Sequence, residues 1–582
     1  MSYVGDNSCI GLLFYGFPQK RSSPPPPLKG APGPLLGDDL VSRFAGGWRG
    51  GTMAISERFG DVGGETGLAR KVAHTRRNPA NRFVFVGLLL VAVALFIVAG
   101  WLAFAPADRA GVNADAAGVQ ATADDAAAKP TYPNVVIFLI DTLRADRVGV
   151  YGYDKPTTPR LDALVAESVI FEQCSAPAPW TLPSVVSLLT STFACEHQVV
   201  IDGQRIVPSL EPLAARLKEA GYATASFLAN AYAGPMSGLD RGYDTCQSVR
   251  FVDGKLVDAW LNTVPADRPF HLYLHNIEPH NPYNAPARLL QQFGDVSDDT
   301  KGLVRERYLG YRKLTRADFA ARRPIGTTDN TAEQAEAMRR LDALKQEIDI
   351  LYDAVVRHAD ERLGSVIDVL KRRGLWDNTL FVATADHGEE LGEHGGWQHD
   401  HSVCEEMIRV PLIVHFPGGR FAGRRVGDVV SLVDVMPTVF EFMGRSEWAT
   451  GCRGVNLLPA VEGRRLPEGA GYRLTSIRIN RKKYYRPYKQ TRGDLNLVIR
   501  RDGYKGIWNA ELQTLELYDL KADPFERSDL ADQHADLAGS MQRFARAWLQ
   551  GCAVDAAEQP AVRPEDLDDQ TLENLRSLGY VE

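Results

Sequence analysis

Residues 134–153 constrain the fold of this chain more than any other segment. Their apolar run, NVVIFLI, ends abruptly at Asp141, and polar residues with a Gly/Tyr turn follow at once. This is typical of a buried parallel strand, whose carboxyl end lies at the edge of an α/β sheet where ligands collect. Residues 379–394 repeat the design, with Asp386 and His387 after a second β-rich run. We therefore predict that these three side chains hold one divalent cation.

Strands and helices alternate along residues 132–464. Patterning predicts strands at 135–140, 224–228, 270–277, 379–383 and 411–415, and helices at 159–167, 209–220, 344–373 and 434–443. The alternation predicts an α/β fold with a mostly parallel sheet and helices on both faces. The polar stretch 295–336 interrupts the pattern, and we expect it to form an irregular insertion near the site entrance.

The pattern changes in residues 465–582. Short β-like runs occur at 473–479, 495–500, 504–508 and 514–518, and residues 533–549 have the spacing of a helix. We predict a smaller C-terminal subdomain made of an antiparallel sheet with one helix packed on it.

Residues 83–105 carry no charge and exceed the roughly 20 apolar residues that cross a bilayer. This favours a transmembrane helix over the alternative of a buried core helix. Basic residues precede the segment, so the N-terminus is expected in the cytoplasm and the rest outside the cytoplasmic membrane, in the periplasm or extracellular space. We expect residues 1–82 to be a disordered cytoplasmic segment and residues 106–131 to be a linker.

Charge and cysteine content exclude some classes of protein. A net charge of -7 over 582 residues does not indicate a nucleic-acid partner. The seven cysteines show no CxxC pair or zinc-type spacing. Cys174 and Cys195 either form a disulfide or remain buried thiols. Core or surface roles are expected for the histidines on or beside apolar runs, which are His197, His271, His275, His358 and His415.

Thr181 stands just ahead of a helix start at Pro183 and Ser184, in the segment APWTLPSVVSLLTS. A hydroxyl there lies at the positive end of the helix, where exposed amide groups bind anions. Coordination to a cation would help to remove its proton. The residues alone leave two alternatives for Thr181, a nucleophile and a simple helix cap.

Several segments resemble, in the same order, the sulfatase family of the alkaline-phosphatase superfamily. They are IDTLRADRVGVYGY, WTLPSVVSLLTS, HNIEPHNPY, TADHGEELGEHG, RVPLIVHFPG, SLVDVMPTVFEFMG, LYDLKADPFERSDLADQ and LRSLGYVE. The resemblance implies an alkaline-phosphatase-like catalytic domain at 132–464, with a doubly wound, mostly parallel sheet, and a small C-terminal sheet at 465–582. It also implies one divalent metal ion beside a nucleophile at a helix N-terminus.

By this resemblance, Asp141, Asp386 and His387 match metal ligands of the family. Thr181 stands at the position of the nucleophile, where the family carries a residue that is converted to formylglycine. The ligand types leave Ca, Mg, Mn and Zn open. A second ion, as in two-zinc relatives, is not favoured, because Asn276 stands where an aspartate would be needed.

The resemblance also assigns residues around the substrate. His280 and His399 match catalytic residues that contact the substrate oxygens or the leaving group, with His401 as an alternative to His399. His394 is expected beside the substrate. Arg144 either faces the bound anion or makes a structural ion pair.

The chain departs from the family pattern at four positions. Threonine at 181 cannot be converted to formylglycine, and Val185 replaces an arginine. Thr142 replaces a metal aspartate, and the segment around Ala229 lacks the family's lysine and histidine. A group bound to Thr181 would therefore be attacked directly by water or an acceptor alcohol, which is easier at phosphorus than at sulfur.

Three hypotheses of function follow. The first is a membrane-anchored, metal-dependent hydrolase of an anionic sulfate or phosphate ester, such as a glycan or lipid head group, with Thr181 as nucleophile. The second is a phosphotransferase that moves a phosphoethanolamine-type group between envelope lipid and glycan. The third is a non-catalytic protein that binds an anionic glycan, suggested by the replacements at Thr142, Val185 and Ala229.

Overall fold

A computed structural model describes residues 132–201, 203–309, 332–394, 397–467, 473–478, 495–501 and 503–551. The chain divides into two units, 1–123 and 124–582, and all described residues belong to the second. The predicted disordered segment 1–82, membrane helix 83–105 and linker 106–131 lie outside the described residues. Across the described ranges, no helix has both the length and the apolar character needed to cross a bilayer.

An eight-stranded sheet forms the centre of the described unit. Its order is β10-β2-β9-β6-β1-β5-β3-β4, with bounds β1 (Asn134–Ile140), β2 (Val169–Ser175), β3 (Ala223–Leu228), β4 (Thr245–Ser248), β5 (Phe270–Asn276), β6 (Thr379–Thr384), β9 (Arg409–His415) and β10 (Arg425–Ser431). Strand β1 pairs in parallel with β5 and β6, and β9 runs antiparallel to β2 and β6. The sheet is therefore mixed, with one antiparallel strand in the mostly parallel arrangement that the sequence predicts.

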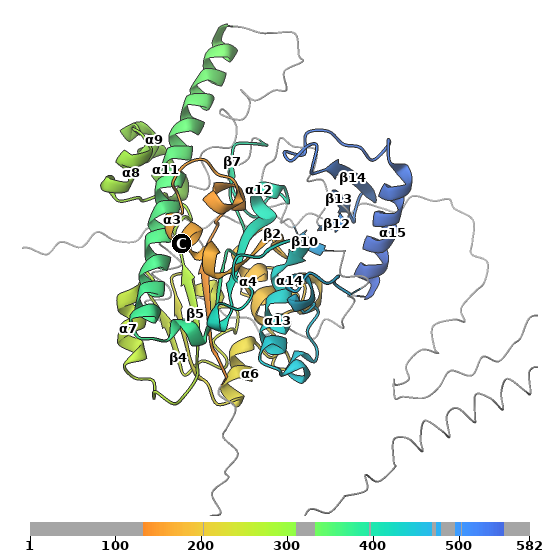
Figure 1. The fold of residues 1–582 in the computed structure, drawn as a ribbon. Coiled ribbons are helices and arrows are strands. Elements are labelled where there is room, and N and C mark those ends of the chain that lie inside the picture. The colour runs from red at the N-terminus through yellow and green to blue at the C-terminus, as the bar shows by residue number, and fades with distance from the viewer. Residues whose placement is uncertain are drawn as a thin grey trace, which may run out of the picture. The chain divides into compact units, whose positions relative to one another are not determined.

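Helices cover both faces of this sheet (Figure 1). One layer contains α11 (Ala332–Arg372), which contacts α3 (Pro159–Leu164), α7 (Gly254–Leu261) and α8 (Ala287–Phe293). The other contains α4 (Thr181–Thr190), which contacts α6 (Leu213–Glu219) and α13 (Val435–Phe442). All seven residues of β1 are buried, because a strand covered on both faces needs apolar residues throughout rather than alternation. The prediction of an α/β fold is confirmed.

Two predicted segments differ from the structure. The helix expected from residue 209 begins at Leu213, because Pro212 at its N-cap restricts the preceding residue to an extended backbone. The stretch 295–336 is not wholly irregular, since it contains α9 (Asp298–Leu309) and the start of α11. The sequence at the start of α11 is rich in Ala, Glu, Gln, Met and Arg, all good helix formers.

The predicted C-terminal sheet is present. Its four antiparallel strands are β11 (Arg473–Arg478), β12 (Leu495–Arg501), β13 (Tyr504–Asn509) and β14 (Thr514–Asp519). Helix α15 (Ala535–Gly551) packs on one face, where Met541 contacts the apolar cluster of β12–β14. The other face packs against α12 (Glu405–Ile408) of the larger unit through Val498 and Met407. The small sheet lies to one side of the central sheet in Figure 1.

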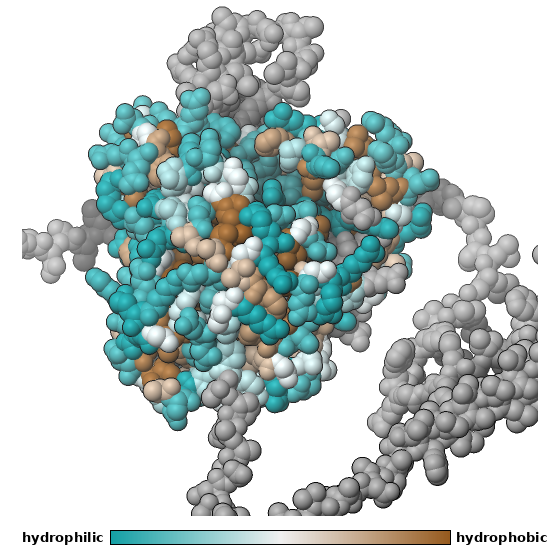
Figure 2. All heavy atoms as spheres, in the orientation of Figure 1, coloured by the Kyte–Doolittle hydropathy of each residue, from teal (hydrophilic) through white to brown (hydrophobic). Residues whose placement is uncertain are grey.

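Over the described residues, the structure also bears on the predicted cysteine pair and on the surface. Cys174 is buried in β2 and Cys195 is half-buried in α5 (Ala194–His197), and no disulfide joins them. Hydrophilic residues cover most of the face in Figure 2, with hydrophobic residues in small separate areas. Functional groups are therefore to be found among buried polar side chains.

Candidate active site

Three neighbouring strands bring ligand groups together at their carboxyl ends. Asp141 directly follows β1, His275 lies near the end of β5, and Asp386 follows β6. Because β5 and β6 flank β1, these side chains meet, and one ligand atom of each lies within 4.8 Å of the others. His275 Nε2 is 3.0 Å from Asp141 Oδ2. All three side chains are fully buried.

His387 lies beside the same group. Its Nε2 atom is 3.5 Å from Asp386 Oδ2, 3.7 Å from Asp141 Oδ1 and 3.2 Å from Thr181 Oγ1. Its Nδ1 atom donates a hydrogen bond to the carbonyl oxygen of Gly388, 2.8 Å away. In the neutral ring this tautomer leaves the lone pair on Nε2, the orientation that metal-binding imidazoles adopt.

The donor set fits a divalent cation. Asp141 Oδ1 and Asp386 Oδ2 are buried without a hydrogen-bond partner, whereas nearly all such atoms in folded proteins are satisfied. Asp386 Oδ1 accepts from the backbone N–H groups of Thr142 at 3.3 Å and His387 at 3.0 Å. Two carboxylates with imidazole nitrogen are ligands of divalent metals.

The pKa shifts of the two aspartates also favour a bound cation. Burial, followed by the charge of Asp141, raises the pKa of Asp386 to about 7. Burial opposes ionisation of Asp141 too, but the hydrogen bond from His275 and nearby imidazoles hold its pKa below the usual range. Without a cation the two carboxylates resist sharing this space as charged groups, and a cation between them would stabilise both as anions.

Thr181 is the first residue of α4, and its hydroxyl faces this group. In addition to His387, the Asn230 amide lies near it, with Nδ2 3.4 Å from Thr181 Oγ1. The helix start is fixed because Ser184 Oγ donates to the carbonyl oxygen of Asp386 at 2.6 Å. The hydroxyl therefore lies at a helix N-terminus, where backbone N–H groups favour an anion.

Sequence reasoning missed two residues of the site. Asn230, two residues after β3, donates from Nδ2 to Asp141 Oδ2 at 2.9 Å and accepts at Oδ1 from the N–H of Tyr232. His275 was expected in a core or surface role, and the structure places it against Asp141. Both follow the rule that identified Asp141, because each lies at or just beyond the carboxyl end of a parallel strand.

Three imidazole rings lie side by side at the edge of this group. The His399 ring centroid is 4.5 Å from that of His387 and 4.9 Å from that of His280. His399 Nδ1 is 3.1 Å from Glu389 Oε1, and His280 Nδ1 donates to the carbonyl oxygen of Asn281 at 2.6 Å. Burial raises the pKa of Glu389 to about 8 and lowers the pKa of His399 to about 3.

Arg144 and His394, both candidates for a place near the substrate, lie beside acidic side chains. The Arg144 guanidinium is buried and pairs with Asp146 at 2.7 Å and Glu393 at 2.8 Å, the structural ion pair that the sequence left as an alternative. His394 Nε2 lies 3.3 Å from Glu406 Oε2, in a second group of polar side chains. Within the described part of the chain, no contact joins either residue to Thr181.

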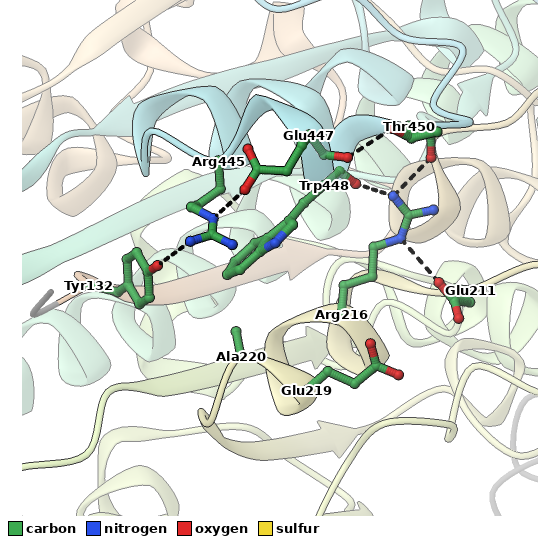
Figure 3. Close-up of a pocket in the computed structure, with 9 residues that line it drawn as sticks. All are labelled: Tyr132, Glu211, Arg216, Glu219, Ala220, Arg445, Glu447, Trp448 and Thr450. Atoms are coloured by element: carbon green, nitrogen blue, oxygen red, sulfur yellow. Dashed lines mark hydrogen bonds and ion pairs between the residues drawn. The ribbon is translucent and has the colours of Figure 1, made fainter. Parts of the chain in front are cut away.

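A surface hollow of about 670 Å³ lies at the opposite edge of the sheet, near the start of β1 (Figure 3). Its basic groups are already paired. Arg445 binds the hydroxyl of Tyr132 at 3.0 Å and the carboxylate of Glu447 at 2.6 Å, and Arg216 lies 3.6 Å from Glu211. The hollow therefore offers no grouping comparable to the buried one at the carboxyl edge.

Comparison with known families shows to which family the chain belongs. Residues 133–445 match the family model described as Sulfatase. The chain belongs to the sulfatase family. Residues 392–545 also match the model for the C-terminal part of N-sulphoglucosamine sulphohydrolase, which overlaps the small antiparallel sheet.

Curated relatives of this sulfatase-family chain are enzymes. N-acetylglucosamine-6-O-sulfatase from Bacteroides thetaiotaomicron is 24% identical over 469 residues, covering 68% of this chain and 82% of the relative. Choline-sulfatase from Rhizobium meliloti is 25% identical over 457 residues, covering 69% and 82%. The multifunctional alkaline phosphatase superfamily protein PehA from Trinickia caryophylli is 29% identical over 299 residues, covering 48% and 55%. The chain is an enzyme of the sulfuric ester hydrolase family.

Solved structures share the fold. A protein in complex with its substrate D-glucosamine-2-N,6-O-disulfate has a TM-score of 0.57 at 20% identity, covering 73% of this chain and 100% of that one. Phosphonate monoester hydrolase of Agrobacterium radiobacter has a TM-score of 0.55 at 19% identity, covering 74% and 100%. Together the relatives and structural neighbours include hydrolases named for sulfate or phosphonate esters.

Proposed function

We propose that this enzyme hydrolyses an anionic sulfate, phosphate or phosphonate ester, with the hydroxyl of Thr181 as nucleophile. One observation carries the proposal. Thr181 Oγ1 lies at the N-terminus of α4, 3.2 Å from His387 Nε2 and next to two buried aspartates with unsatisfied oxygens. A hydroxyl held between a ligand group and the positive end of a helix can attack an anionic ester.

Asp141, His275, Asp386 and His387 are the side chains that would hold a divalent cation. When bound there, such a cation supplies Lewis-acid polarisation of an ester oxygen and lowers the pKa of a neighbouring hydroxyl. Oxygen and imidazole donors together suit several divalent ions.

Other side chains would position the Thr181 hydroxyl and supply a proton to the leaving oxygen. The Asn230 amide donates toward Thr181 Oγ1 and Asp141 Oδ2, which fixes the hydroxyl relative to the carboxylate. His280 and His399 each have Nδ1 engaged by a protein oxygen, so a proton that either ring gives to a leaving oxygen would come from Nε2. Because a threonine ester cannot collapse to an aldehyde, water must attack the bound group directly. This step favours phosphate or phosphonate esters over sulfate esters.

The test uses the full-length chain purified in detergent, with aryl sulfate, aryl phosphodiester, aryl phosphonate monoester and glucosamine 6-sulfate as substrates. Thr181→Ala should lower kcat/KM by at least about 1,000-fold, the scale of losing a nucleophile. Thr514→Ala, an exposed threonine of β14, is the matched control and should leave kcat/KM unchanged. Unchanged turnover by Thr181→Ala would exclude this nucleophile.

The other two hypotheses are not favoured. The relatives that match over most of their length are named sulfatases, rather than transferases or binding proteins. Product analysis with and without an added acceptor alcohol checks this point, because a hydrolase releases the free anion in both cases.

We also propose that residues 83–105 anchor the enzyme in the cytoplasmic membrane with the catalytic unit outside. The uncharged segment and the basic residues before it support this arrangement. Protease treatment of intact spheroplasts should cleave the catalytic unit while leaving cytoplasmic proteins intact. Protection of the catalytic unit, or its recovery in the soluble fraction, would contradict the proposal.

A further inference from the structure

A second buried group of ligand-type side chains lies between the catalytic unit and the C-terminal sheet. His394, Cys404, Glu406 and Glu526 each offer one ligand atom, and these four atoms lie within 4.8 Å of one another. His394 follows β7 (Glu390–Leu391), Cys404 is the N-cap of α12, and Glu406 lies within α12. Glu526 comes from the loop between β14 and α15. The group thus joins the segment after β7 and helix α12 to a loop of the C-terminal subdomain.

The atoms at the centre of this group are not satisfied by the protein. Glu406 is 5% exposed, and its Oε2 atom has no hydrogen-bond partner. The closest basic atom, His394 Nε2 at 3.3 Å, has no hydrogen-bond partner either. Two electron-pair donors that face each other, one of them on a buried side chain, cost free energy unless a proton or a cation lies between them. A cation bound by both would remove that cost.

The charges around the group also leave room for a cation. Lys505 Nζ lies 2.7 Å from Glu526 Oε1 and 3.1 Å from Glu405 Oε1, and Arg500 Nη1 lies 3.6 Å from Glu405 Oε2. Lys505 and Arg500 therefore pair with Glu526 and Glu405, and neither of them pairs with Glu406, on which Arg144 acts only through its charge. Burial, followed by the charge of Glu526, raises the pKa of the Cys404 thiol, which only direct coordination would deprotonate.

We propose that His394, Cys404, Glu406 and Glu526 bind a zinc ion that fastens the C-terminal sheet to the catalytic unit. A thiolate, an imidazole and carboxylates are the donors that zinc takes in tetrahedral sites, whereas calcium and magnesium prefer oxygen alone. All four protein ligands are present, so the site is of the closed, structural type.

This position links the zinc site to the active site. Glu406 accepts through its carbonyl oxygen the N–H of Glu389 at 3.0 Å, and Met407 accepts that of Gly388 at 2.7 Å. The segment that follows Asp386 and His387 is thus held by α12. Loss of the zinc ion should loosen α12 and lower activity without removing any group that contacts substrate.

The experiment replaces bound metal with Co²⁺ in the full-length chain. Thiolate coordination gives a sulfur-to-cobalt charge-transfer band in the near ultraviolet, and no thiol lies among the catalytic ligands. The band should be present in the native chain and in Asp386→Asn, which damages only the catalytic group. It should vanish in Cys404→Ser and persist in Cys246→Ser, an exposed matched control. Absence of the band in the native chain, or its survival in Cys404→Ser, overturns the proposal.

Metal analysis gives a second, independent readout. Glu406→Gln should hold one zinc ion fewer per chain than the native enzyme and should melt at a lower temperature. If His394 is simply protonated and paired with Glu406, the native chain and Glu406→Gln will contain the same amount of zinc, and the proposal fails. Because neither readout uses turnover, failure here is distinguishable from failure of the proposed hydrolase function.

Discussion

At the scale of single residues, the candidate active site is marked by two carboxylates that each lack one hydrogen bond. Asp141 and Asp386 are fully buried, yet each keeps one oxygen without a hydrogen-bond partner. Their remaining contacts come from His275, Asn230 and backbone N–H groups, all of which hold the carboxylates in place. Such an arrangement is stable only with a cation or a proton between the acids.

His275 gives a prediction at this scale. Substitution His275→Ala removes an imidazole whose ligand atom lies within 4.8 Å of a carboxylate oxygen of both Asp141 and Asp386. The affinity for a divalent cation should therefore fall by about 10–100-fold. Titration calorimetry of the metal-free chain measures this. The matched control is His271→Ala, which lies on the same strand and bonds Val135 rather than the site. Equal affinities for the two variants would show that His275 is not part of the cation site.

At the scale of elements, ion pairs hold the loops that carry the site. Arg144, three residues after Asp141, pairs with Glu393, which follows β7. Both side chains are largely buried, so the pair is little screened by solvent. The contact ties the loop after β1, which carries Asp141, to the loop after β7.

The Arg144–Glu393 pair predicts a pH dependence of stability. Burial opposes ionisation of Glu393, but the charge of Arg144 lowers its pKa from 4.5 to about 2. A depressed carboxylate stabilises the fold above its unfolded pKa, and this contribution is lost as pH falls from about 4.5 towards 2. Over that interval, the unfolding free energy of Glu393→Gln should therefore fall by roughly 2–3 kcal/mol less than that of the native chain.

Urea unfolding at several pH values measures this effect. The control Glu441→Gln changes an exposed carboxylate of α13 and should follow the native curve. A Glu393→Gln curve parallel to the native one would contradict the prediction.

The helix of the C-terminal subdomain gives a second prediction at this scale. Met541 of α15 is buried against β12–β14, and Met541→Ala should cost about 2–5 kcal/mol by leaving a cavity. Arg546→Ala changes an exposed position of the same helix and should cost far less. Thermal unfolding compares the two, and similar losses would mean that α15 does not pack as described.

At the scale of the whole molecule, the described unit holds two separate groups of metal-type ligands. One lies at the carboxyl edge of the central sheet, and the other lies where the segment after β7 and helix α12 meet the C-terminal subdomain. Chelation should therefore lower the melting temperature of the full-length chain, since a ligand at 100 times its Kd adds about 2.7 kcal/mol of stability. In Asp386→Asn the decrease should be smaller but present, because the second group remains.

Calorimetric scans before and after chelation test this, followed by addition of Ca²⁺, Mg²⁺, Mn²⁺ or Zn²⁺ one at a time. Recovery of activity identifies the catalytic ion. A melting temperature that chelation leaves unchanged would contradict both cation sites.

Much of the fold was predictable, because local patterns carry it. Continuous apolar runs such as β1 indicate strands buried on both faces, and their alternation with helices indicates the layered sheet. The direction of β9 was not predictable, since an apolar run reads the same in either direction. The start of α6 is set by Pro212. The prediction followed the helical spacing of the apolar residues and therefore began the helix too early, at residue 209.

For the active site, the sequence by itself determined which polar residues end a buried strand or begin a helix. Asp141, Asp386 and Thr181 are recognisable on that ground. Only the tertiary structure decided that β5 lies beside β1, which brings His275 to Asp141, and that Asn230 after β3 reaches the same group. The physical reason is that strand order is set by pairing between distant segments, whereas periodicity and capping report only on neighbours along the chain.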